Sequence, residues 1–115
     1  MKFIDDIRKA IELEVRESSD PAEYFEAVFW SKDLDTLSLL LRDTIGEPLK
    51  PPGKKVKIPK HINSIVNLIG GIRPEQSFYI KEEANGEYTY VVLWPWQSDP
   101  SRITLKIGIG RFSSV

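Results

Sequence analysis

The sequence predicts a single α+β domain over residues 1–115, with three N-terminal helices, a short fourth helix and then a three-stranded antiparallel β-meander. Three observations support this prediction. Apolar residues recur at helical spacing through the helical half, 1–46. An Asn-Gly pair separates two alternating, aromatic-rich runs, and a third run alternates without a break to the end of the segment 77–112. A chain of 115 residues is long enough for one hydrophobic core but not for two domains.

The first hairpin of the meander is predicted from Asn85 and Gly86. Both residues tolerate positive φ, so the pair favours a two-residue type I′ turn. In that register Ile80 lies opposite Val91, and side chains alternate between the two faces of the sheet. One face is then expected to carry Phe78, Ile80, Val91 and Leu93, and the other Tyr79, Lys81, Tyr88, Tyr90, Val92, Trp94 and Trp96.

The third strand is predicted from Ile103 to Gly110, where apolar residues occupy every second position. Pairing Leu93 with Leu105 makes the aliphatic face continuous across three strands. The same register places tyrosine rings over bare glycines, which is a known stabilising arrangement in sheets. Pro95 has no N–H for a ladder, so we expect it beyond the last paired residues. The expected pairs are Leu93–Leu105, Val91–Ile107, Tyr90–Gly108 and Tyr88–Gly110.

Two helices are predicted before the third. The first, Lys2–Arg16, has an apolar stripe at spacings of three and four residues. The second begins at Asp20-Pro21-Ala22-Glu23, which combines an Asp N-cap, a proline at the first helical position and a glutamate. The first stripe comprises Ile4, Ile7, Ile11 and Val15, and the second Tyr24, Phe25, Val28 and Phe29, with Trp30 near its end.

The third helix is predicted over Leu34–Ile45, with Ser31 or Asp33 as N-cap and Gly46 after its end. It is apolar nearly all round, so it is expected to be buried. The predicted packing surface is the sheet face with Phe78, Ile80 and Leu105. Burying a leucine contributes about 2 kcal/mol, and Leu41→Asp is therefore expected to unfold the domain.

A basic, proline-rich connector, 47–58, is predicted to lack regular structure, although a short strand over 56–58 is compatible with the sequence. The fourth helix is predicted over 59–70, ending at Gly70-Gly71. Its β-branched residues leave a strand as an alternative, but their spacing favours a helix. The residues that define its apolar face are Ile62, Ile65, Val66 and Ile69.

Composition argues against most catalytic chemistry. There is no cysteine, which excludes disulfides and thiolate metal sites. His61 is the single histidine, so histidine-based metal sites and catalytic triads are not expected. The carboxylates fall on predicted helix surfaces rather than in a cleft. We therefore expect no catalytic residue, no metal site and no cofactor, and predict that the protein is not an enzyme.

The sequence also predicts a cytoplasmic protein that does not interact with membranes. No apolar run approaches the roughly 20 residues that span a bilayer. The N-terminal residues include Asp5 and Asp6 and lack the apolar core of a signal peptide.

The first candidate site is the aromatic face of the meander, on which the aromatic side chains are interleaved with Lys81, Arg102 and Lys106. Aromatic and cationic side chains on a sheet can bind a second chain, accept a covering helix or subunit, or stack single-stranded nucleic acid. Cover by the fourth helix or a partner subunit is the simplest interpretation. The favoured function is a non-enzymatic interaction module that binds another protein or itself. Its predicted partner-binding residues are Tyr79, Tyr88, Tyr90, Trp94, Trp96, Lys81 and Lys106.

The second candidate site is the basic segment before the fourth helix. Residues 48–74 hold six basic residues and no acidic one. An anion there would compensate the lysines near the helix N-terminus by binding the free N–H groups of Ile62, Asn63 and Ser64. A solvated loop is the simpler interpretation. The alternative function is nucleic-acid or phosphate-ligand binding through the aromatic face and the basic segment, with Lys54, Lys55, Lys57, Lys60 and His61 as the anion-binding residues.

Overall fold

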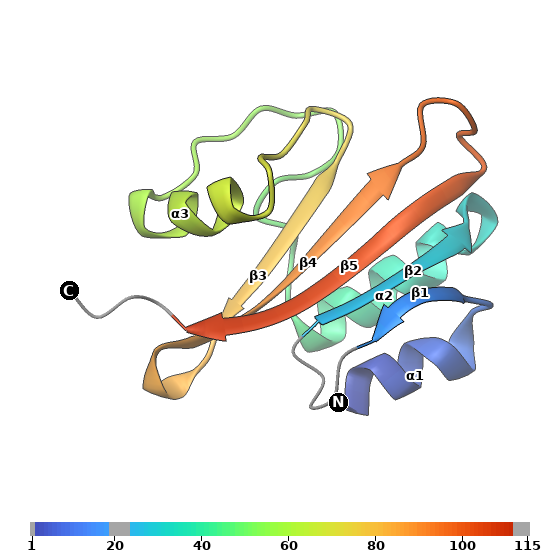
Figure 1. Ribbon diagram of the computed structural model, residues 1–115, viewed down its shortest axis with the longest axis horizontal. Helices are drawn as coiled ribbons and strands as arrows, with labels where there is room; N and C mark the ends of the chain where they lie inside the picture. Colours follow the sequence, from blue (N-terminus) through green and yellow to red (C-terminus); the bar gives the residue numbers. More distant parts are fainter. Residues whose placement is uncertain (1, 19–23, 112–115) are drawn as a thin grey trace.

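The computed structural model describes residues 2–18 and 24–111 and shows an antiparallel five-stranded sheet with the strand order β1-β2-β5-β4-β3 (Figure 1). The fold is α+β as predicted. The predicted arrangement of three N-terminal helices and a three-stranded meander is wrong, because two N-terminal segments are strands of the same sheet. The elements are α1 (Lys2–Ala10), β1 (Glu14–Ser18), β2 (Tyr24–Trp30), η1 (Ser31–Asp33), α2 (Leu34–Thr44), α3 (Lys60–Leu68), β3 (Ser77–Glu82), η2 (Ala84–Gly86), β4 (Glu87–Pro95) and β5 (Arg102–Arg111).

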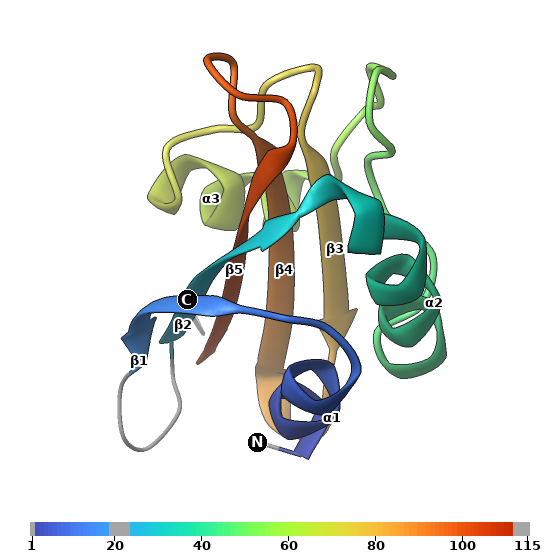
Figure 2. The same ribbon diagram turned by 90° about the vertical axis from the view of Figure 1, so that its right-hand side faces the viewer.

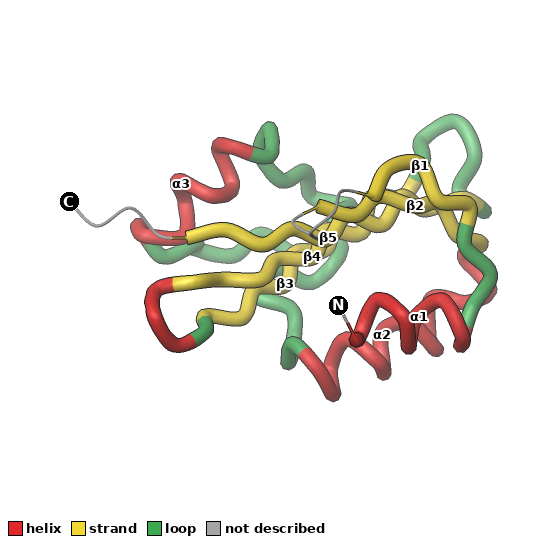
Figure 3. Tube along the Cα trace, turned by 60° about the horizontal axis from the view of Figure 1, so that its bottom comes forward, coloured by secondary structure: helices red, strands yellow, loops and turns green. Residues whose placement is uncertain are grey.

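The sheet separates two helical layers. Helices α1 and α2 lie on one face, and α3 lies on the other (Figures 2 and 3). The larger core, between the sheet and α1 and α2, includes the fully buried Phe25, Leu41 and Leu105. The smaller core lies under α3 and draws its sheet residues from β3 and β4. Helix α3 therefore covers only part of its face, and the region over β2 and the start of β5 carries no helix (Figure 3).

The prediction of one helix from Lys2 to Arg16 is wrong beyond residue 10. The apolar stripe holds as far as Ile11, whose N–H donates to the carbonyl of Ile7 at 3.0 Å. The chain then forms β1, which pairs antiparallel with β2. Val15, predicted to extend the buried stripe, is instead exposed. Pairing with β2 supplies hydrogen-bond partners for the backbone N–H and C=O groups of both strands. The spacing of apolar residues in the sequence does not reveal this pairing.

The predicted second helix is the strand β2, and its proposed start at Asp20 lies outside the described residues. Strand β2 is hydrogen-bonded on both sides, to β1 and to β5. Phe25, Ala27 and Phe29 point into the larger core at strand spacing. The aromatic and β-branched residues of this run suit a strand better than a helix. This pairing with two neighbours outweighs the local helix-start pattern.

The register predicted for the first hairpin is wrong by one residue. Instead of a two-residue turn, the chain makes a short 3₁₀ turn at Ala84–Gly86, where Gly86 has φ +74°. Phe78 consequently pairs with Val92, and Tyr79 pairs with Val91. A one-residue shift moves every side chain of a strand to the opposite face. Phe78 therefore lies under α3, and Tyr79 lies in the larger core.

The register predicted between the second and third strands of the meander is confirmed. Leu93 pairs with Leu105, and the two tyrosine–glycine pairs form as expected, with Tyr90 opposite Gly108. The prediction that Pro95 lies beyond the paired residues is wrong, since it pairs with Ile103 at the end of β4. The backbone N–H of Trp96, the next residue, donates to the backbone carbonyl of Arg102 at 3.0 Å. Because backbone groups alternate in direction along a strand, the nitrogen of Pro95 points away from β5, toward the β3 side of β4. The pairing with β3 stops at Leu93, so no ladder hydrogen bond is lost at Pro95.

The two helices predicted from residues 34 and 59 are confirmed as α2 and α3. Helix α2 packs on the face with Leu105, but Phe78 and Ile80 lie on the opposite face under α3, so that part of its predicted packing surface is wrong. Neither Asp33 nor Pro59, the two N-cap residues, makes a side-chain capping bond. The connector has no strand at 56–58. Within the described residues, no helix is both long and apolar enough to cross a membrane.

Candidate functional site

Helix α3 covers part of the predicted aromatic face and leaves the rest of it open. Tyr88 and Tyr90 lie under this helix, and their rings cover Gly110 and Gly108 of β5. Tyr88 is buried and Tyr90 half-buried. Burial raises the pKa of Tyr90, and the neighbouring Tyr88 raises it further. These two tyrosines therefore belong to the core and offer little surface to a partner.

Two other predicted residues lie on the wrong face for this site. Tyr79 is only 4% exposed and packs with α1 and α2. Its burial raises the pKa of its hydroxyl, which also hydrogen-bonds the Ser38 side chain. Lys81 extends from the same strand face and donates to the carbonyl of Thr44 at 3.4 Å. Both residues are displaced from the predicted face by the one-residue register shift of β3.

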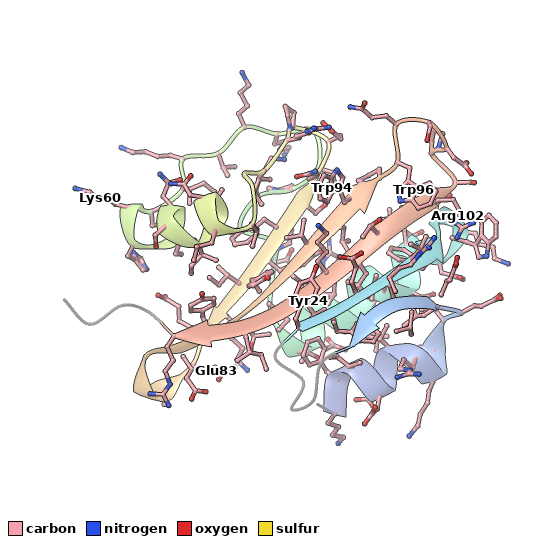
Figure 4. The ribbon with its side chains drawn as sticks, in the orientation of Figure 1. Tyr24, Lys60, Glu83, Trp94, Trp96 and Arg102 are labelled. Atoms are coloured by element: carbon pink, nitrogen blue, oxygen red, sulfur yellow. The ribbon has the colours of Figure 1, made fainter. Side chains whose placement is uncertain are left out.

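The remaining predicted residues lie together on the part of the face that α3 leaves uncovered. Trp94 and Trp96 come from β4 and the residue after it, and Lys106 comes from β5. Strand β2 adds Trp30, which lies opposite Arg102 in register. Figure 4 shows Trp94, Trp96 and Arg102 gathered at one end of these strands. We call this set the tryptophan patch: Trp30, Trp94, Trp96, Arg102 and Lys106.

Arg102 is the centre of the tryptophan patch. Its guanidinium lies 4.5 Å from the ring centroid of Trp30 and 5.3 Å from that of Trp96. Its terminal nitrogen donates to a carboxylate oxygen of Glu14 at 2.7 Å. The Nε atom is buried and has no hydrogen-bond partner in the described chain. Two rings and one ion pair from three elements therefore hold this side chain in one orientation.

The second cation of the patch is Lys106. Its ammonium lies 4.2 Å from the ring centroid of Trp94. The neighbouring indole, that of Trp96, donates its N–H to the hydroxyl of Thr104 at 2.8 Å. Both tryptophans are half-buried, so each ring packs on the sheet and still presents surface to the outside. This is a pre-formed apolar surface with fixed cations.

An open hollow of about 520 Å³ lies beside the patch. The loop before β3 contributes Arg73 to its wall, and β2 contributes Glu26. Glu26 accepts a hydrogen bond from the Tyr24 hydroxyl at 2.7 Å. The size is in the range of ligand-binding pockets. The lining residues that bear on chemistry are Glu26, Arg73, Trp94, Trp96, Thr104 and Lys106.

The predicted anion-binding residues lie elsewhere. Lys54, Lys55, Lys57 and Lys60 are all exposed, and Lys60 on α3 lies far across the molecule from Trp96 (Figure 4). The N–H groups of Ile62 and Asn63, predicted to be free, both donate to the carbonyl of Pro59 at 3.0 Å.

His61, the last residue of that predicted set, lies 2.9 Å from a carboxylate oxygen of Glu82. The structure therefore gathers no anion cradle at this helix start.

One lysine of the basic connector has a different role. Lys50 is 5% exposed, and its ammonium donates to the carbonyls of Pro51, Pro74 and Gln76 at 3.0, 2.8 and 2.7 Å. Desolvation lowers the pKa of this amine, and the negative charge of Glu75 acts in the opposite direction. Lys50 thus ties the connector to the loop that leads into β3.

The sequence prediction missed Trp30, Arg73 and Glu26 as parts of the site, whereas Arg102 was expected among the cations of the aromatic face. The sequence predicts a helix over Trp30 and Glu26, and a helix gives no reason to expect either residue on the sheet face. The pattern that would have placed them there is a strand alternation, with Tyr24, Glu26, Val28 and Trp30 on one face and Phe25, Ala27 and Phe29 on the other. Arg73 comes from a loop, and no periodicity predicts where a loop residue lies.

Among the residues that the structure describes, no group of three or more histidine, cysteine or acidic side chains is arranged to hold a metal ion. Comparison of the chain with protein-family models, with curated proteins and with solved structures gave no match.

Proposed function

We propose that this domain is a non-catalytic binding module that holds another protein chain through the tryptophan patch. The observation that carries the proposal is the collection of three tryptophans and an arginine on the part of a sheet face that has no covering helix. Tryptophan and arginine are enriched at the energetic centres of protein interfaces. The cytoplasmic location expected from the sequence is part of this proposal.

The rigidity of the patch supports the proposal further. Arg102 is fixed between Trp30 and Trp96, and Trp96 is fixed by Thr104. A surface whose side chains are ordered before binding loses less conformational entropy on association. Trp30 is 39% exposed, a larger exposed fraction than that of any other residue of the patch.

Nucleic-acid binding is supported less well by the same geometry. The chain's own cations occupy faces of Trp94, Trp30 and Trp96 on which bases would stack. The carboxylates of Glu14 and Glu26 lie on the same side of the sheet and would repel a phosphate backbone. The overall charge is −1, whereas nucleic-acid-binding domains are commonly basic.

The experiment that tests the proposal compares three immobilised proteins: the wild type, Trp30→Ser and Leu68→Ser. Leu68 is a highly exposed apolar residue of α3, outside the patch, so its variant is the matched control. We expect a protein from an extract of the source cells to be enriched by the wild type and Leu68→Ser but not by Trp30→Ser. Binding must then be reproduced with that protein purified.

Self-association is tested in parallel by light scattering behind a sizing column at two widely separated concentrations. A second copy as the partner predicts a dimer that Trp30→Ser dissociates and Leu68→Ser does not. Equal capture by all three proteins, together with a monomer at every concentration, would overturn the proposal.

A further inference from the structure

The hollow beside the tryptophan patch has two cations on its walls, Arg73 and Lys106. Arg73 is exposed, and Lys106 is half-buried over Trp94. Neither side chain forms an ion pair with any acidic side chain that the structure describes. Lys106 lies directly opposite Glu26 in the β2–β5 register, yet its ammonium lies over an indole ring.

Two acids on this side of the sheet, Glu14 and Glu26, are already engaged. Glu14 pairs with Arg102 at 2.7 Å and with Arg16 at 3.4 Å. The carboxylate of Glu26 accepts a hydrogen bond from the hydroxyl of Tyr24. The hollow itself therefore has two positive charges against the single negative charge of Glu26. A negatively charged ligand would balance the excess positive charge of the residues that line the hollow.

The loop that presents Arg73 is fixed in place. The backbone N–H of Arg73 donates to the side-chain oxygen of Gln76 at 2.9 Å, and the N–H of Gln76 donates back to the carbonyl of Arg73 at 3.0 Å. Gln76 is buried. The ammonium of Lys50 holds the carbonyls of Pro74 and Gln76. Arg73 thus projects from an anchored turn toward the same hollow as Lys106.

We propose that this hollow receives an acidic segment of the partner chain that also carries an aromatic or aliphatic side chain. Arg73 and Lys106 bind the segment's carboxylates by charge-assisted hydrogen bonds, since guanidinium and ammonium groups are matched to carboxylate oxygens. The exposed parts of Trp94 and Trp96 receive the apolar side chain. This inference rests on the proposed protein-binding function and names the class of segment that the function requires.

The experiment uses the full chain and measures fluorescence anisotropy of labelled short peptides. The main probe alternates glutamate with phenylalanine, and its control replaces each glutamate with lysine. We expect the acidic peptide to bind, and Arg73→Gln with Lys106→Gln to weaken its Kd by about tenfold or more, because hydrogen bonds to charged groups are lost. The lysine peptide is expected not to bind. Lys106→Arg keeps the charge and is expected to keep the binding.

The matched control removes the same charge elsewhere. Lys54→Gln with Lys55→Gln changes two exposed connector lysines and is expected to leave the Kd of the acidic peptide within about twofold, since the overall charge is the same but the site is intact. Thermal melting of each variant verifies that it is folded at the temperature of the assay.

Three results would overturn the inference. The acidic peptide fails to bind, both double variants weaken it equally, or oligothymidine binds more tightly than the peptide and depends on Arg73 and Lys106. The last result assigns the hollow to nucleic acid. The proposed protein-binding function is judged separately, by the loss of its partner in Trp30→Ser, so the two hypotheses can fail independently.

Discussion

The ring of Tyr90 occupies the space that a β-carbon on Gly108 would need. The two residues are opposite each other in the β4–β5 register, and a methyl group at Gly108 would overlap the phenol ring. The arrangement fits an aromatic ring against bare backbone in the middle of the sheet. Glycine at this position is therefore required for packing and not for a turn.

Gly108→Ala is expected to lower the free energy of unfolding by about 1–3 kcal/mol, the usual cost of overpacking a core. The measurement is urea denaturation followed by circular dichroism. In a Tyr90→Ala background the same substitution should cost much less, because the ring that it would meet is gone. An equal cost in both backgrounds would show that the ring is not the cause.

Lys50→Met is expected to destabilise the domain by about 1–3 kcal/mol, because three carbonyl oxygens, among them the buried one of Gln76, lose the ammonium as a donor. The control is Lys54→Met, an exposed neighbour in the same connector, which should change stability by less than about 0.5 kcal/mol. Both are measured by urea denaturation. Equal stability of the two variants would mean that desolvation of the Lys50 ammonium cancels its hydrogen bonds.

Alkaline unfolding is expected to depend on Tyr79 and Tyr90, whose pKa values are raised above the ordinary 10.0 mainly by burial. As pH rises past that value, the unfolded chain loses these protons first, so the free energy of unfolding falls. The double variant Tyr79→Phe with Tyr90→Phe should show a shallower fall above about pH 10.

Comparing how steeply the free energy of unfolding falls with pH in the wild type and in the double variant isolates the contribution of the two tyrosines. The lowered pKa of Lys50 makes stability rise with pH toward the ordinary lysine value, but it does so equally in the wild type and in the double variant. At neutral pH the double variant is expected to lose about 1 kcal/mol from the missing hydrogen bond to Ser38. Identical slopes above about pH 10 would contradict the prediction.

Leu41→Asp is expected to unfold the domain, because Leu41 is fully buried and an unpaired buried carboxylate costs several kcal/mol, about as much as a small domain's total stability. Leu39→Asp on the same helix is the matched control, since Leu39 is 61% exposed. Its melting temperature should change little. A cooperative wild-type-like transition in Leu41→Asp would show that α2 is not packed as described.

The elements that local patterns predicted correctly are those whose determinants lie within a few residues or across one short connection. Helix α2 follows from its apolar spacing and from Gly46, which takes φ +109° after its end. The β4–β5 register follows from alternation and from the need of Tyr90 for a glycine partner. Both predictions rest on residues that are adjacent in the chain or directly paired.

The tertiary structure decided what depends on distant partners. Residues 24–30 carry a pattern that suits a helix or a strand, and hydrogen bonds to β1 and β5, the latter more than 70 residues away, select the strand. The hairpin loop lengthened by one residue and exchanged the faces of Phe78 and Tyr79.

The tryptophan patch shows the same division. Most of its composition was visible in the sequence, since Trp94, Trp96, Arg102 and Lys106 were expected on one sheet face. Trp30 joined it only because β2 lies beside β5. Arg73 reaches the hollow beside the patch only because the loop before β3 is tied down by Lys50. Backbone hydrogen bonds between strands are non-local. The sequence by itself therefore determined the alternation of β4 and β5, and folding determined that β1 and β2 join them in one sheet and which side chains meet on its faces.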